Sequence, residues 1–258
     1  RPFLADENWV KKAKENRADE INTCIACNQA CLDHTFSNKV SSCLVNPRAC
    51  HETELNYTPT SNKKKIAVVG AGPAGLSFAS IAAERGHAVT LFDAEKEIGG
   101  QFNMAKKIPG KEEFYETLRY FNKQLALHKV DVQLNKRVTA DDLKSFDEVV
   151  IATGISPRNL QLEGIKHPKV LSYIDVLKNG ANVGKKVAVV RLRRAEHLDH
   201  TRQQTISASS HIDGFNGQPH RVDADHPSSS RIQAEHSVAA AAGQTTVSVI
   251  CKRPVKAS

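Results

Sequence analysis

The most constraining feature of this sequence is a glycine-rich turn that joins a buried strand directly to a helix. The apolar run 66–69 leads into Gly-Ala-Gly-Pro-Ala-Gly at 70–75, and a second apolar run, 88–92, ends at Asp93. This order of strand, glycine turn, helix, strand and acidic residue is the fingerprint of a dinucleotide-binding βαβ unit. We therefore predict an α/β fold built on a parallel, Rossmann-like sheet.

Each glycine of the turn has its own physical role. Gly70 permits the tight turn, Gly72 lets the backbone approach a pyrophosphate, and Gly75 lets the helix pack closely on the strand. The pyrophosphate would lie at the N–H groups of the helix N-terminus, and Asp93 would accept hydrogen bonds from the adenosine ribose. The alternative is an ordinary glycine-rich turn that binds no ligand.

Further elements are predicted on the C-terminal side of this unit. A second glycine-rich loop, Ile98-Gly99-Gly100-Gln101, lies where flavoproteins place the other flank of the dinucleotide. Apolar residues at helical spacing predict a helix over 111–128. Apolar runs predict strands at 130–134, 147–151 and 185–190. The last of these is typical of the first strand of a second nucleotide-binding fold.

Four cysteines upstream follow the pattern C-x2-C-x3-C-x11-C, at Cys24, Cys27, Cys31 and Cys43. Structural zinc sites more often use two separated Cys pairs, or Cys with His, whereas compact cysteine runs are typical of iron–sulfur clusters. A disulfide framework would need an oxidising compartment, which nothing else in the sequence indicates. The spacing favours an iron–sulfur cluster held by loops within 24–58, and zinc and disulfides stay as alternatives.

Composition excludes several classes of partner. The net charge is +8, but aromatic residues make up 5% and basic residues are scattered, which argues against a nucleic-acid platform. No apolar run is long enough to span a membrane, and the N-terminus lacks a signal-peptide pattern. We expect a cytoplasmic protein with reduced cysteines. Because the only methionine is Met104, we also expect a piece of a longer protein.

The C-terminal stretch 191–258 differs from the rest. A second glycine fingerprint should follow the strand at 185–190, but the chain continues with Arg-Leu-Arg-Arg instead. Only 12 of these 68 residues are Leu, Ile, Val or Phe, below the level at which a core is expected. The sequence therefore predicts a tail that is disordered or frameshifted.

With these motifs in place, the chain resembles the bacterial NADPH-dependent 2,4-dienoyl-CoA reductases. They belong to an iron–sulfur flavoprotein family, related to Old Yellow Enzyme, that includes enoate reductases and trimethylamine dehydrogenase. The resemblance covers roughly residues 1–190. It is carried by CIACNQACLD (24–33), SCLVNPRACHE (42–52), KIAVVGAGPAGL (65–76), IGGQFNMAKKIPGKEEF (98–114), VVIATG (149–154), VLSYIDVL (170–177) and VGKKVAVV (183–190).

The resemblance implies a three-part enzyme of unsaturated fatty acid β-oxidation. A (β/α)8 barrel holds FMN and the acyl-CoA site, the cysteines ligate a [4Fe–4S] cluster, and two nucleotide-binding domains carry FAD and NADPH. Electrons pass from NADPH to FAD, through the cluster to FMN, and then to the dienoyl-CoA. A barrel side chain supplies the proton.

Transferred to this sequence, the resemblance assigns Cys24, Cys27, Cys31 and Cys43 as cluster ligands. It gives Cys50 a packing role instead. The positions matching FAD contacts are Gly70, Gly72, Ala74, Gly75, Asp93, Gln101, Lys111 and Val138. No catalytic residue is assigned, because the barrel that carries the family's acid is absent.

The predicted layout follows from these assignments. Residues 1–23 are the end of a barrel with a connector, 24–58 the cluster segment, and 63–182 an incomplete FAD-binding domain. Residues 183–190 are the first strand of a truncated NADPH-binding domain, followed by the tail from 191. The leading hypothesis is the electron-transfer section of a dienoyl-CoA reductase-like enzyme, inactive alone toward acyl-CoA. The alternatives are a non-catalytic remnant and a zinc-binding interaction module.

Overall fold

The computed structural model describes residues 2–157, 163–192, 207–211 and 247–252. The chain divides into two compact units, Arg1–Ile155 and Ser156–Ser258. The first unit ends inside the predicted 63–182 domain, and that domain assignment stays a prediction. No helix within the described residues is long and apolar enough to cross a membrane.

A four-stranded parallel sheet forms the centre of the first unit. Its strands are β1 (Lys65–Val69), β2 (Ala88–Phe92), β3 (Asp131–Gln133) and β4 (Glu148–Ile151). The strand order is β3-β2-β1-β4, and all three pairings are parallel. This confirms the α/β fold class and the Rossmann-like sheet. β4 is an edge strand among the described residues, and its Ile151 is 66% exposed.

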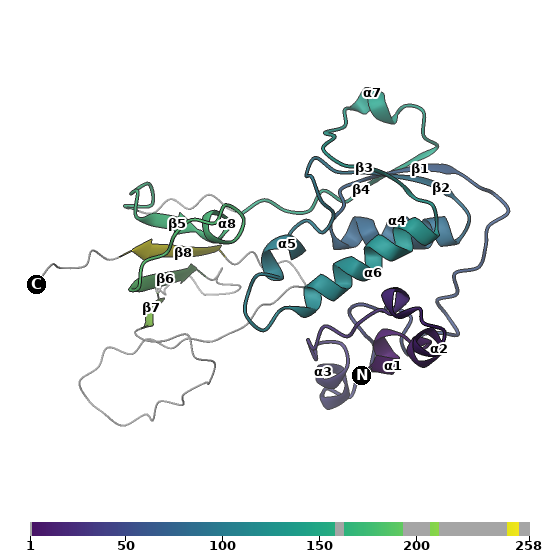
Figure 1. The fold of residues 1–258 in the computed structure, drawn as a ribbon, viewed down its shortest axis with the longest axis horizontal. Helices are drawn as coiled ribbons and strands as arrows, with labels where there is room; N and C mark the ends of the chain where they lie inside the picture. Colours follow the sequence, from purple (N-terminus) through teal and green to yellow (C-terminus); the bar gives the residue numbers. More distant parts are fainter. Residues whose placement is uncertain (1, 158–162, 193–206, 212–246, 253–258) are drawn as a thin grey trace, which may run out of the picture. The chain divides into compact units, whose positions relative to one another are not determined.

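Two long helices pack together against this sheet, as Figure 1 shows. They are α4 (Pro73–Glu84) and α6 (Glu113–Leu127). Helix α6 lies within the predicted span 111–128. The core between helices and sheet is apolar, and Val68, Leu76 and Leu91 are completely buried in it. Burying such side chains contributes about 1.5–3 kcal/mol each, so this layer is the main source of stability for the glycine turn above it.

Short helices complete the first unit. Helix α5 (Phe102–Ala105) follows the second glycine-rich loop, and α7 (Ala140–Leu143) begins with a capping box formed by Thr139 and Asp142. Upstream of the sheet lie α1 (Pro2–Ala5), α2 (Trp9–Lys14), the 3₁₀ turn η1 (Ala18–Glu20) and α3 (Leu32–Phe36). Figure 1 shows α1 and α2 on the side of α6 away from the sheet. The cysteine segment is otherwise loop, as its sequence predicts.

The second unit contains an antiparallel sheet. Its elements are β5 (Val170–Ser172), α8 (Tyr173–Leu177), β6 (Val187–Leu192), β7 (Ser207–His211) and β8 (Val247–Lys252), and the strand order is β5-β8-β6-β7. The predicted strand at 185–190 is present as β6, but both of its pairings are antiparallel, unlike the parallel pairing of a first Rossmann strand. The NADPH-domain assignment stays a prediction.

The predicted tail, 191–258, is described only in part. Within it, the structure describes the last two residues of β6 together with β7 and β8. The remaining stretches, 193–206, 212–246 and 253–258, lie outside the described residues.

Candidate functional site

The glycine turn adopts a backbone that side chains at two positions would not allow. Gly70 has a φ of +111°, and a Cβ there would overlap the carbonyl group of Ala152. A Cβ at Gly75 would overlap the carbonyl oxygen of Gly70 itself. These are the tight-turn and close-packing roles predicted for the two glycines. The turn is therefore built by contact between β1, β4 and the start of α4.

Gly72 differs, because it faces open space. A Cβ at Gly72 would have no protein atom within 4 Å. The second glycine-rich loop runs beside it: the Gly99 N–H donates to the Ala71 carbonyl at 2.7 Å, and a Cβ at Gly100 would lie 3.1 Å from the Gly72 Cα. The free space next to Gly72 suits the close approach of a pyrophosphate.

The uncapped backbone N–H groups at the N-terminus of α4 also lie next to Gly72. Gly72 is the N-cap and Pro73 the first helical residue, and no side chain caps the exposed N–H groups. Aligned peptide dipoles and free N–H groups at a helix start favour an anion. The residues present therefore fit a dinucleotide whose pyrophosphate lies against Gly72.

Asp93 stands at the end of β2 and is tied to the glycine turn. Its Oδ2 accepts a hydrogen bond from the Ala71 N–H at 2.6 Å, and its Oδ1 accepts one from the Glu95 N–H at 2.8 Å. A carboxylate has about four lone-pair sites, so acceptor capacity is left for ribose hydroxyls. The carboxylate is half-buried, which fixes its orientation at the edge of the site.

The other residues predicted to contact FAD lie at several different places in the first unit. Ala74 is exposed in the first turn of α4, and the Gln101 side chain donates to the Ile155 carbonyl at 3.3 Å. Lys111 lies in the turn before α6, where its backbone N–H donates to Ile108, and Val138 is half-buried between β3 and α7. The glycine turn follows β1 and Asp93 follows β2, and the Ala71–Asp93 hydrogen bond joins these two strand ends. The FAD contacts of all of these residues stay predictions.

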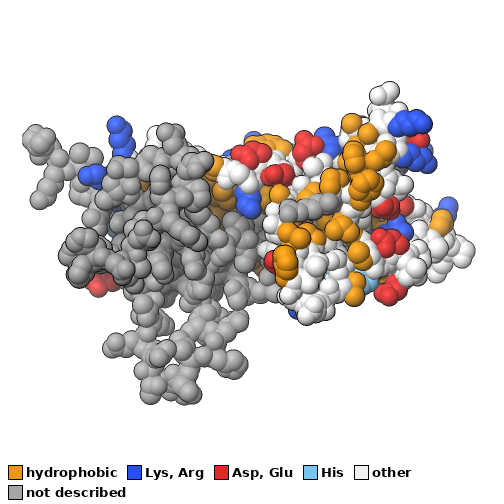
Figure 2. Space-filling model, turned by 90° about the horizontal axis from the view of Figure 1, so that it is seen from below, with side chains coloured by type: hydrophobic (Ala, Val, Ile, Leu, Met, Phe, Trp, Pro, Cys, Tyr) orange, Lys and Arg blue, Asp and Glu red, His pale blue; other side chains and the backbone are white. Residues whose placement is uncertain are grey.

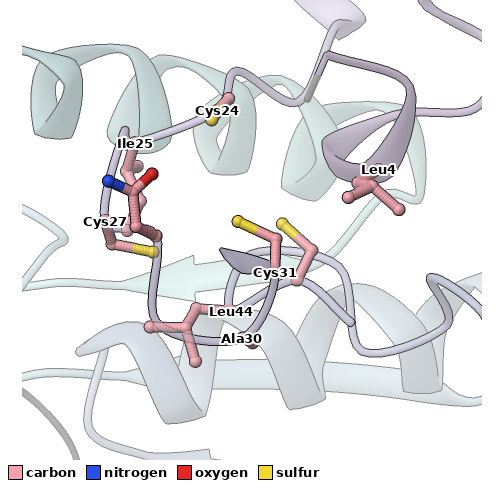
Figure 3. Close-up of a pocket in the computed structure, with 9 residues that line it drawn as sticks. Leu4, Cys24, Ile25, Cys27, Ala30, Cys31 and Leu44 are labelled. Carbon is pink, nitrogen blue, oxygen red and sulfur yellow. The ribbon is translucent and has the colours of Figure 1, made fainter. Parts of the chain in front are cut away.

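The four predicted cluster cysteines line one pocket. The cavity itself is small and partly open to solvent. Figure 3 shows the sulfurs of Cys24, Cys27 and Cys31 around a common space. The complete lining is Leu4, Cys24, Ile25, Cys27, Asn28, Ala30, Cys31, Cys43 and Leu44. The sequence pattern therefore places the four cysteines in the lining of one pocket that contains no charged side chain.

Electrostatics link the cysteines of this pocket. Burial raises the pKa of the Cys43 thiol, and the neighbouring Cys24 and Cys27 raise it further, whereas backbone N–H groups of Val45 and Asn46 lower it. Five cysteines, Cys50 among them, are free thiols. None of these five cysteines forms a disulfide in the described structure. In its described part, no group of three or more His, Cys, Asp or Glu side chains converges on one metal ion.

Cys50 lies outside the pocket. We expected it to have a packing role, and that expectation is wrong because the residue is exposed. Its backbone φ is +64°, and its N–H donates to Glu52 Oε1 at 3.0 Å. Cys50 is therefore an exposed residue of a turn.

Buried polar side chains that the sequence did not single out position the cysteine segment. Asp6 is 4% exposed, and its Oδ2 accepts hydrogen bonds from Lys12 Nζ at 2.6 Å and from the Asn22 N–H at 2.9 Å. The Asn22 side chain donates to the Val45 carbonyl at 2.7 Å. These contacts connect Asp6, which follows α1, to Asn22 before the first cysteine and, through Asn22, to Val45 after the fourth cysteine. No local sequence motif indicates these hydrogen bonds, because the bonded residues lie 16 and 23 positions apart in the sequence.

Comparison with protein families agrees with this geometry. Residues 64–191, which begin just before β1 and contain the whole glycine fingerprint, match the family described as pyridine nucleotide-disulphide oxidoreductase. These residues form a pyridine nucleotide-disulphide oxidoreductase domain. The assignment implies an FAD-type flavin and a place among flavin-dependent oxidoreductases.

Curated proteins give matches longer than the 128 residues of this oxidoreductase domain. The chain is 38% identical over 196 residues to a metal reductase of Desulforamulus reducens, and the match covers 74% of this chain and 29% of the relative. It is 37% identical over 202 residues to an NADH oxidase of Thermoanaerobacter brockii, covering 74% and 30%. The chain thus spans less than a third of the length of these relatives.

Solved structures of larger redox enzymes are also similar to this chain. A 2-naphthoyl-CoA reductase in complex with 2-naphthoyl-CoA is 39% identical, with a TM-score of 0.69 over 72% of this chain and 29% of that chain. A 6-hydroxypseudooxynicotine amine oxidase from Pseudomonas geniculata N1 is 30% identical, with a TM-score of 0.62 over 70% and 30%. About seven-tenths of this chain is therefore similar to part of larger redox enzymes.

Proposed function

We propose that this chain is the electron-transfer section of an iron–sulfur flavoprotein oxidoreductase. FAD would bind at the glycine fingerprint, and a [4Fe–4S] cluster would bind at Cys24, Cys27, Cys31 and Cys43. The observation that carries the proposal is that four cysteine side chains line one pocket in the same compact unit as the fingerprint. One body would then hold a two-electron carrier and a one-electron carrier.

The flavin side of the proposal rests on the turn around Gly72. The open space at Gly72 and the uncapped start of α4 would hold the pyrophosphate, and Asp93 would orient the adenosine ribose. Bound FAD would supply the exchange between hydride transfer and single-electron transfer. The protein's part is to bind and orient the dinucleotide against the ends of β1 and β2.

The cluster side rests on the donor set. Thiolates are the ligands of iron–sulfur clusters, and hydrogen bonds and solvent exposure tune their potentials. The Ala26 N–H already donates to Cys24 Sγ at 3.4 Å, and the apolar Leu4, Ile25, Ala30 and Leu44 restrict water at the pocket. These residues fit a cluster better than a hydrated ion.

The finer proposal is a parent enzyme similar to 2,4-dienoyl-CoA reductase. NADPH would reduce FAD, and the cluster would pass electrons to FMN in a barrel that acts on an acyl-CoA. Support comes from the likeness to a reductase solved with 2-naphthoyl-CoA. Two other relatives are named bilirubin reductase and cinnamate reductase, and both names fit a reductase of this kind.

The surface around the cysteines fits a larger parent. Exposed apolar side chains on this segment include Phe3, Phe36, Val40 and Leu44. Figure 2, seen from the side of the N-terminal helices, shows hydrophobic side chains spread over this part of the molecule. Large apolar patches mark interaction sites. We propose that the FMN barrel of the parent covers this face.

Anaerobic reconstitution with iron and sulfide tests the cluster. The wild type and Cys50→Ser should both gain visible charge-transfer absorbance and, after dithionite reduction, the EPR signal of a reduced cluster. Cys27→Ser should lose both, because one iron loses its thiolate. A wild type that takes up one zinc and no iron would refute the proposal in favour of a zinc module.

A further inference from the structure

Arg119 on α6 uses every one of its side-chain donors. Its Nε donates to Glu116 Oε2 at 2.7 Å on the same helix. Nη1 donates to the carbonyls of Ala18, at 3.2 Å, and Asp19, and Nη2 donates to the Ile21 carbonyl at 2.9 Å and to Thr23 Oγ1 at 3.4 Å. A guanidinium has five N–H donors, and here all five have an acceptor.

Four of these five acceptors lie on one short stretch, 18–23, which ends immediately before Cys24. The carbonyls of η1 and of the residue after it face Arg119, and a cation at the C-terminal end of a helical turn is favourable. Lys123, one turn further along α6, adds an ion pair with Asp19 at 2.8 Å. Asp6 also holds this stretch, because its carboxylate accepts a hydrogen bond from the Asn22 N–H.

These contacts join the oxidoreductase domain to the segment that carries the cysteines. Helix α6 belongs to the oxidoreductase domain, whereas residues 18–23 lead into the cysteine pocket. We propose that Arg119 is a positioning residue that fixes the arm carrying Cys24 onto the oxidoreductase domain, and so sets the first thiol of the pocket relative to the FAD fingerprint. Its redox meaning rests on the function proposed above.

The chemistry requires arginine at this position. The guanidinium is a planar fork that bonds several acceptors in one fixed geometry, whereas a lysine ammonium is a point charge with three donors on a flexible stem. Lysine would keep the charge beside η1 but could not span acceptors from Ala18 to Thr23. Electron transfer depends steeply on the separation of its centres, so a fixed arm has a direct functional use.

Hydrogen exchange on the full chain tests the proposal without a cluster. In Arg119→Lys, the backbone amides of Glu20, Ile21 and Asn22 should exchange about tenfold faster than in the wild type, because charge-assisted hydrogen bonds that oppose local opening are lost. Amides of β1 and β2 report whether the domain remains folded. Arg85→Lys is the matched control, since Arg85 also bonds a backbone carbonyl, that of Thr58, at 3.2 Å.

A second measurement separates positioning from general stability. After reconstitution, Arg119→Lys should lose its cluster absorbance to a chelator about tenfold faster than the wild type and Arg85→Lys, while β1 and β2 stay protected. Unchanged exchange at 20–22 in Arg119→Lys would overturn the proposal. A wild type that assembles no cluster would instead refute the proposed function, and the exchange result would still decide whether Arg119 fixes the arm.

Discussion

The oxidoreductase fold around the parallel sheet and the cysteine segment before it are held together in different ways. The sheet is stabilised by backbone pairing and by a continuous apolar core under α4 and α6. The cysteine segment has few buried apolar side chains and depends on individual polar contacts, such as those of Asp6 and Asn22. The sheet region is thus stabilised by many weak apolar contacts, whereas the cysteine segment depends on a few specific hydrogen bonds.

The largest effect should come from filling the space between turn and helix. Gly75→Val would force a side chain into the Gly70 carbonyl, and we expect it to lower the free energy of unfolding by about 3 kcal/mol. Denaturant unfolding followed by circular dichroism measures this loss. Gly72→Ala, which has free space, is the control; equal losses in both variants would contradict the packing role.

The second effect tests the polar contacts. Asp6→Ala leaves the Lys12 ammonium and the Asn22 N–H without their acceptor, and we expect a local destabilisation of about 2 kcal/mol. Hydrogen exchange should rise at residues 20–24 and stay unchanged in β1. Glu15→Ala, which removes an exposed partner of Arg17, should change little. Global unfolding in Asp6→Ala would show that the two regions are not separable.

The third effect isolates ligand binding from folding. Gly72→Ala should leave the free energy of unfolding nearly unchanged but raise the dissociation constant for FAD at least about tenfold, because a methyl group would occupy the space for the pyrophosphate. Titration followed by flavin fluorescence measures it. Gly184→Ala, in equally open space, should bind FAD like the wild type. Unaltered affinity in Gly72→Ala would place the pyrophosphate elsewhere.

The smallest effect is visible only at high pH. Burial, followed by the nearby Asp6, Glu84 and Glu7 carboxylates, raises the pKa of Tyr120. Because the folded phenol then keeps its proton where the unfolded one has lost it, stability should fall as pH rises above about 10. Tyr120→Phe should remove up to about 1.4 kcal/mol per pH unit of that fall. The exposed Tyr115→Phe is the control, and equal slopes in both variants would disprove the assignment.

The same contrast explains what the sequence could predict. β1, α4 and β2 were predictable because apolar periodicity and the glycine turn encode them locally. That the four cysteines line one pocket was predictable from their spacing, and their role as ligands stays a prediction. The anchors Asp6, Asn22 and Arg119 were not, because each is an ordinary polar residue whose partner lies far away in the sequence. The antiparallel pairing of β6 was not predictable either, because it depends on strands further along the sequence. The exposure of Cys50 was missed because no local pattern indicates it.

The open edge at β4 has a consequence for handling the protein. Its outer N–H and C=O groups have no partner strand among the described residues, and Val149 and Ile151 are exposed beside them. An unprotected apolar strand edge is a template for pairing with another chain. We therefore expect concentrated solutions of this chain to self-associate through β4, and a lysine in place of Ile151 to keep it dispersed.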